Sequence, residues 1–141
     1  SAAAAVVAEA SANVNLNNGA LALFVGDSAG RLYSSIHKGT TISAIGLYIA
    51  APHTGVFTSL NDIVGDLNKI RVNATEAQST ADQGTGNYLA YPIYFGARAG
   101  TTAFFNGYED TSIIRFGPNL DDTTISKVES YVASKTPEET I

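Results

Sequence analysis

Short runs of β-branched and aromatic residues, separated by turn-forming residues, dominate the chain. Gly, Pro, Asn and Asp recur at short intervals, for example at Asn17-Asn18-Gly19 and Gly96–Gly100, and leave little room for long helices. This spacing predicts an antiparallel β-sandwich or small barrel. The expected strands are Ala20–Val25, Arg31–Ile36, Thr41–Ala50, Tyr88–Phe95, Thr101–Asn106 and Ser112–Phe116.

The run Thr41–Ala50 has the clearest alternation. Ile45, Leu47 and Ile49 fall on one face, and Ala44, Gly46 and Tyr48 fall on the other. Because successive side chains of a strand point to opposite faces, the aliphatic face is predicted to lie in the core.

The run Tyr88–Phe95 is apolar on both faces. Such a strand is usually covered on both sides. Pro92 cannot donate a ladder hydrogen bond, so the strand is expected at a sheet edge or at a bulge. An edge strand covered on both faces is a candidate for contact with another subunit.

Two segments have helical periodicity. The first is Ser59 to about Ala77, and the second is about 121–134, where Asp121 and Asp122 favour the helix N-terminus. The predicted class is therefore α+β, dominated by β-structure, with two short flanking helices. The apolar positions at helical spacing are Leu60, Ile63, Val64, Leu67 and Ile70 in the first segment, and Ile125, Val128 and Val132 in the second.

The first residues are rich in alanine. Residues 1–15 are expected to form a short helix or an extended arm, and residues 16–141 a single β-rich domain that ends in the C-terminal helix. Ser1 is a small residue of the kind left by removal either of an initiator Met or of a signal peptide. No run is apolar enough to predict a membrane span.

Charge and cysteine content exclude several classes of protein. Charged residues make up 15% of the 141 residues, with a net charge of −5, against about 25% in ordinary domains. The acids concentrate in residues 119–141, and no basic patch is present, which argues against binding to nucleic acid. The chain has no cysteine, so disulfides, zinc-thiolate sites and thiol nucleophiles are excluded.

One motif is compatible with catalysis. Gly26-Asp27-Ser28-Ala29-Gly30 fits the G-x-S-x-G pattern and resembles the nucleophile elbow of esterases in the hormone-sensitive lipase group. An elbow turns into a helix, whereas Arg31–Ile36 alternates like a strand, and no acid lies between Ser28 and His37 or His53. The favoured interpretation is a β-turn, so no catalytic residue is predicted.

The remaining candidates give no cofactor or metal site. His37 and His53 lie next to turn signals, and neither has an acid or a second histidine at the spacing of a metal pair. Gly84-Thr85-Gly86 lacks the third glycine and the following helix of a dinucleotide site.

A short resemblance points to virus structural proteins. The stretch from Gly39-Thr40-Thr41 through Ala44-Ile45-Gly46-Leu47 to Ala50-Ala51 resembles part of the trimeric head-decoration proteins of lambda-like phages. Phage tail-tube subunits, which are β-sandwiches with a flanking helix, are similar in their elements. The resemblance implies a structural role, and it assigns no role to any single residue.

The sequence therefore predicts a structural, self-assembling subunit of a virion, phage tail or capsid, or of an extracellular filament. Its expected partners are copies of itself and other structural proteins, and the expected location is a virion or the cell exterior, with the cytoplasm left open. A carbohydrate- or ligand-binding module and a small serine hydrolase around Ser28 remain as alternatives. The residues expected at its interfaces are Ala2, Val6, Val7, Tyr88, Tyr91, Tyr94 and Phe95.

Overall fold

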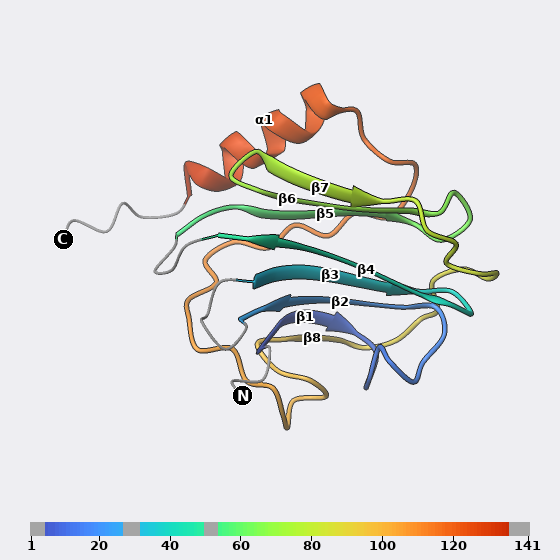
Figure 1. The fold of residues 1–141 in the computed structure, drawn as a ribbon. Coiled ribbons are helices and arrows are strands. Elements are labelled where there is room, and N and C mark those ends of the chain that lie inside the picture. Colours follow the sequence, from blue (N-terminus) through green and yellow to red (C-terminus); the bar gives the residue numbers. More distant parts are fainter. Residues whose placement is uncertain (1–4, 27–31, 50–53, 136–141) are drawn as a thin grey trace.

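Two antiparallel sheets and one helix make up the part of the chain that the structure, a computed structural model, describes: residues 5–26, 32–49 and 54–135 (Figure 1). The larger sheet has the strand order β4-β3-β2-β1-β8, and the smaller has the order β5-β6-β7. The β-dominated α+β class predicted from the sequence is confirmed. The elements are β1 (Ala5–Ala10), β2 (Ala20–Val25), β3 (Leu32–Lys38), β4 (Ile42–Tyr48), β5 (Phe57–Asp62), β6 (Leu67–Val72), β7 (Thr75–Ser79), β8 (Ile93–Phe95) and α1 (Asp122–Ala133).

The helix predicted at Ser59–Ala77 is wrong, because this segment forms β5, β6 and β7. Two turns within this segment interrupt any helix. Asp66 has a φ of 52° in the first, and Asn73 and Ala74 have φ values of 47° and 66° in the second. Two successive residues with positive φ fit the tight turn that joins antiparallel strands, and this turn stops any helix. In β6 the buried apolar residues are Ile70 and Val72, which lie two apart on the same face of the strand, whereas Leu67 lies on the other face.

The predicted N-terminal arm or short helix is also corrected. Residues Ala5–Ala10 form β1, which pairs with β2 on one side and with β8 on the other. Val6 and Glu9 are fully buried. The Glu9 carboxylate accepts a hydrogen bond from the backbone N–H of Val14 (2.6 Å) and forms an ion pair with Arg98 (Oε2 to Nε, 3.0 Å). Tertiary packing thus overrides the helical preference of alanine.

Only some of the other predicted strands are present in the described structure. Ala20–Val25 forms a strand with the predicted limits. In Tyr88–Phe95 only the last three residues are a strand, at the edge of the larger sheet. Neither Thr101–Asn106 nor Ser112–Phe116 forms one of the strands that the structure describes.

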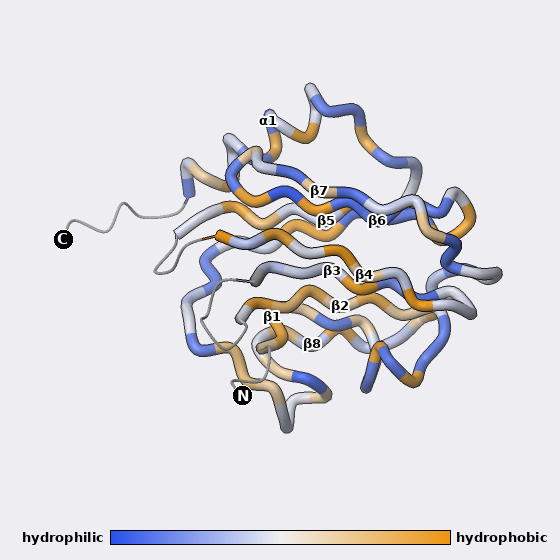
Figure 2. The backbone as a smooth tube through the Cα atoms, in the orientation of Figure 1, coloured by the Kyte–Doolittle hydropathy of each residue, from blue (hydrophilic) through white to orange (hydrophobic). Residues whose placement is uncertain are grey.

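The hydrophobic core lies on one face of the larger sheet. Alternate residues of β2 are buried there, and residues that are distant in the sequence, such as Tyr91 and Ala103, pack against them. Figure 2 shows that β2 is mostly hydrophobic, whereas hydrophobic and hydrophilic residues are mixed along β6 and α1. The buried members of this core are Val6, Val14, Ala20, Ala22 and Phe24.

The smaller sheet packs on the opposite face of β3 and β4. Tyr33 of β3 meets Phe57 of β5 edge to face, with ring centroids 5.6 Å apart. Asn68 of β6 donates from Nδ2 to the carbonyl oxygens of Ser35 (3.2 Å) and Ser43 (3.1 Å). An aromatic contact and side-chain hydrogen bonds therefore both join the two sheets.

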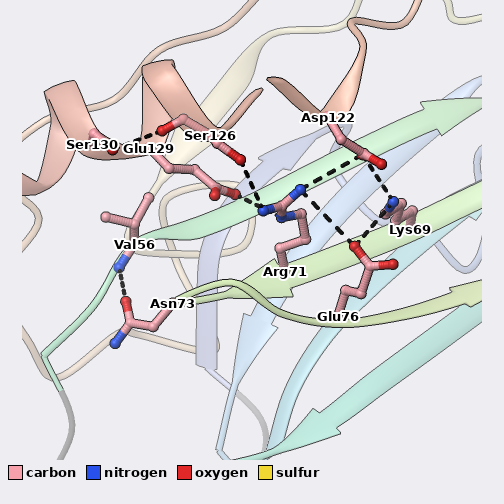
Figure 3. Close-up of polar contacts among 9 residues, drawn as sticks. All are labelled: Val56, Lys69, Arg71, Asn73, Glu76, Asp122, Ser126, Glu129 and Ser130. Atoms are coloured by element: carbon pink, nitrogen blue, oxygen red, sulfur yellow. Dashed lines mark hydrogen bonds and ion pairs between the residues drawn. The ribbon is translucent and has the colours of Figure 1, made fainter. Parts of the chain in front are cut away.

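The predicted C-terminal helix is confirmed as α1, which lies over the smaller sheet (Figures 1 and 3). Asp121 caps it by accepting a hydrogen bond from the backbone N–H of Thr124 (2.7 Å), and this bond holds the pKa of Asp121 below its usual value. Ion pairs then fix α1 to β6. Arg71 Nε lies 3.1 Å from Glu129 Oε1, and Lys69 Nζ lies 3.3 Å from Asp122 Oδ1.

Ile70→Ala should lower the free energy of unfolding by about 2–5 kcal/mol, because it opens a cavity between the two sheets. Val64→Ala is the matched control. Val64 is exposed, so its truncation should change the stability by less than about 0.5 kcal/mol. Urea unfolding of the two variants checks this, and equal effects would contradict the assignment of Ile70 to the core.

Candidate functional site

A cluster of hydroxyl, imidazole and amide groups lies between the two sheets. His37 of β3 places Nδ1 2.6 Å from the Tyr88 hydroxyl and Nε2 2.9 Å from Ser35 Oγ. Ser35 Oγ in turn lies 2.8 Å from Ser59 Oγ of β5. Ser35 and His37 have no exposed surface.

A serine beside a histidine raises the question of catalysis. Burial lowers the pKa of His37 to about 3 and raises the pKa of Tyr88, so both groups are neutral near pH 7. A general base works best with a pKa near the working pH and must reach its substrate. His37 meets neither condition, because its pKa is about 3 and it has no exposed surface. We therefore interpret its contact with Ser35 as a structural link between the sheets.

The sequence pattern does not reveal this cluster. It indicates only that His37 is next to a turn, and it does not show that Tyr88 and Ser59, which are distant in the sequence, lie beside it in the fold. His37 lies inside β3, and the available signal is the spacing of Tyr33, Ser35 and His37, which share one face of a strand. Ser28 of the G-x-S-x-G motif and His53 lie outside the described residues.

The predicted interface residues lie in different environments. Val6 is fully buried in the chain's own core, so it is corrected from an interface residue to a core residue. Val7, Tyr88, Tyr91 and Tyr94 are partly buried. Tyr88 contacts His37, and Tyr91 donates to the carbonyl oxygen of Asn18 (3.0 Å). Phe95 is exposed (49%), and Ala2 lies outside the described residues.

Several large apolar side chains are exposed further along the chain. Tyr108 is 92% exposed and Phe116 is 73% exposed. We call these residues, together with others on the same segment, the 104–116 apolar segment. Its members are Phe104, Tyr108, Ile113, Ile114 and Phe116, all of which are exposed.

Within the described structure, the backbone of this segment is paired at Phe105, whose N–H donates to the carbonyl oxygen of Gly96 (2.8 Å), and is unpaired beyond it. Among the described residues, no backbone hydrogen bond joins residues 106–120 to one another or to the rest of the chain. The segment is the connection between the larger sheet and α1, shown in orange in Figure 1. Its polar contacts are local ones, from Ser112 to Glu109 and from Arg115 to the carbonyl oxygen of Pro118.

An open depression adjoins the start of this segment. Phe95 and Phe105 line it together with Glu109, Asp110 and Ser112. Within residues 5–26, 32–49 and 54–135, no group of three or more His, Asp and Glu side chains is placed to hold a metal ion. No helix in the same ranges is long and apolar enough to cross a membrane.

No family model, curated protein or solved structure matches this chain.

Proposed function

We propose that the chain is a structural subunit that assembles with copies of itself into a larger particle or filament. The observation that carries this proposal is the 104–116 apolar segment, which exposes large side chains and, from residue 106 on, makes no backbone–backbone hydrogen bond with the described residues. Contiguous exposed apolar surface is uncommon on monomeric proteins and marks interaction sites. Burial of such surface stabilises a contact by about 25 cal/mol per Å².

The low charge supports the same proposal. With only 15% charged residues, the surface has few groups that resist burial against a neighbour, and depletion of charge is typical of interface centres. Virion, phage-tail and extracellular-filament components are the classes that the sequence suggests. Other structural proteins are its expected further partners.

A carbohydrate-binding module is the second candidate. The open depression combines the rings of Phe95 and Phe105 with the carboxylates of Glu109 and Asp110, and aromatic faces beside hydrogen-bonding groups suit a sugar ring. Such a module would remain a monomer, so size in solution separates the two candidates. For a serine hydrolase, the described residues offer no support, because the one histidine among them is buried.

Replacement of Tyr108 or Phe116 by Asp should weaken self-association at least about tenfold, because each change places a charge in a contact that must lose its water. Sedimentation velocity at matched concentrations measures the effect, and circular dichroism confirms that the variants are folded.

Leu16→Asp is the control, since Leu16 is 76% exposed but lies on a different part of the chain. It should associate like the wild-type protein. If all three variants behave alike, the 104–116 apolar segment is not the interface.

A further inference from the structure

The region from Ser112 to Phe116 has the properties of a β-strand without a sheet. Its residues are mostly β-branched or aromatic, which favours strands. Its backbone groups have no backbone partners among the described residues. Arg115 carries the one charge of residues 111–120, and in the described structure its side chain contacts a backbone carbonyl oxygen and no carboxylate.

The larger sheet offers a matching edge at β4. This strand is the last in its sheet and pairs on one side with β3. Natural proteins protect such edges with charged residues or proline, yet Ile42–Tyr48 contains neither. The other edge strands have one of these protections or are very short, because β5 ends in Asp62, β7 contains Glu76, and β8 has three residues.

Acidic side chains gather beside the start of β4. The backbone N–H of Thr41 donates to the carbonyl oxygen of Gln83 (3.0 Å), and the backbone N–H of Gln83 donates to Asp66 Oδ1 (2.8 Å). Asp82 precedes Gln83 and is exposed, and Asp62 is exposed at the end of β5. Among the described residues, no lysine or arginine forms an ion pair with these three aspartates.

We propose that Ser112–Phe116 of one copy adds to β4 of a second copy as an antiparallel strand. The antiparallel direction follows from charge. It places the C-terminal end of the added strand, with Arg115, beside the start of β4 and the aspartates that lack an ion pair. A parallel strand would place Arg115 at the Tyr48 end of β4 instead, away from these aspartates.

The lengths are compatible with this pairing. At about 3.4 Å per residue, the five added residues span about 17 Å and lie within the length of β4. The main-chain hydrogen bonds of the added strand would join the backbone of Ser112–Phe116 to the side of β4 that does not pair with β3. Donor and acceptor are different surfaces, so the contact is head-to-tail and generates a ring or an open filament.

This inference rests on the proposed self-assembly and defines its geometry. A charge exchange tests it. Arg115→Glu places a negative charge against the aspartates, and Asp82→Lys places a positive charge against Arg115. Like charges that face each other across an interface cost enough to weaken association at least about tenfold.

A mixture of the two variants provides the decisive measurement. In a head-to-tail contact, the new negative charge of the first variant meets the new positive charge of the second, and the unchanged Arg115 of the second meets the unchanged Asp82 of the first. Each variant alone should therefore sediment as smaller species than wild type, and the equimolar mixture should recover assembly. A misfolded variant cannot be rescued in this way.

Other outcomes separate the two proposals. If the wild-type protein assembles and either charge variant assembles equally well alone, or if the mixture stays dissociated, strand addition at β4 is wrong and self-assembly stands. If the wild-type protein itself does not assemble, both proposals fail.

Discussion

Acidification below about pH 6.5 should destabilise the folded chain by about 1.4 kcal/mol per pH unit through His37 alone. The folded protein holds the pKa of His37 at about 3, because burial removes the water that would stabilise the imidazolium ion. In the unfolded chain the same group has its ordinary pKa of about 6.5. Between these two values the unfolded state binds the extra proton, so stability is fully present above about pH 6.5 and is lost as the pH falls.

Urea unfolding at pH 7, 6 and 5 measures this effect before most carboxylates titrate. His37→Gln removes the titrating group. Between pH 7 and pH 5, the free energy of unfolding of this variant should therefore fall by about 1 kcal/mol less per pH unit than that of the wild-type protein. The comparison uses slopes, and any loss of stability at pH 7 from the missing contact to Tyr88 does not affect it. His53→Gln is the control. If His37→Gln keeps the slope of the wild-type protein, His37 is not held neutral in the folded chain.

Deletion of residues 1–10 should abolish folding, because it removes β1 from between β2 and β8. The loss includes two fully buried side chains, Val6 and Glu9, and leaves Arg98 without its carboxylate partner. The deletion removes the backbone pairing and packing of about six residues. As an order-of-magnitude estimate, the loss in free energy of unfolding exceeds the 5–15 kcal/mol by which domains are usually stable. Circular dichroism and resistance to proteolysis measure the result.

A shorter deletion, of residues 1–4, is the control, because it removes none of the described contacts and should leave a folded protein. The alternative view of the N-terminus as a dispensable arm predicts that both truncations fold. A folded and cooperative protein without residues 1–10 would therefore contradict the place of β1 in the sheet.

Local patterns predict those elements in which local preference and tertiary packing agree. The run Ala20–Val25 has the limits of β2, and the capped, amphipathic segment at 121–134 forms α1. The prediction fails at Ser59–Ala77, where the apolar residues have helical spacing but the segment forms three strands. There the turns at Asp66 and at Asn73-Ala74 determine the structure.

The candidate site is predictable only in part. The residue types of Ser112–Phe116 predict a strand, but in the described structure this run has no strand to pair with. The apolar faces of Tyr88–Phe95 predict an interface there. The chain itself partly covers Tyr88 and Tyr91, through their contacts with His37 and Asn18, whereas Leu89, Ile93 and Phe95 are exposed. Contacts between residues so far apart in the sequence leave no local signal.

Electron microscopy of the purified full-length chain, over a series of increasing concentrations, tests the proposed self-assembly most directly. Head-to-tail association predicts rings or filaments of regular repeat that become more abundant or longer as the concentration rises. Single particles of monomer size at every concentration would contradict the proposal.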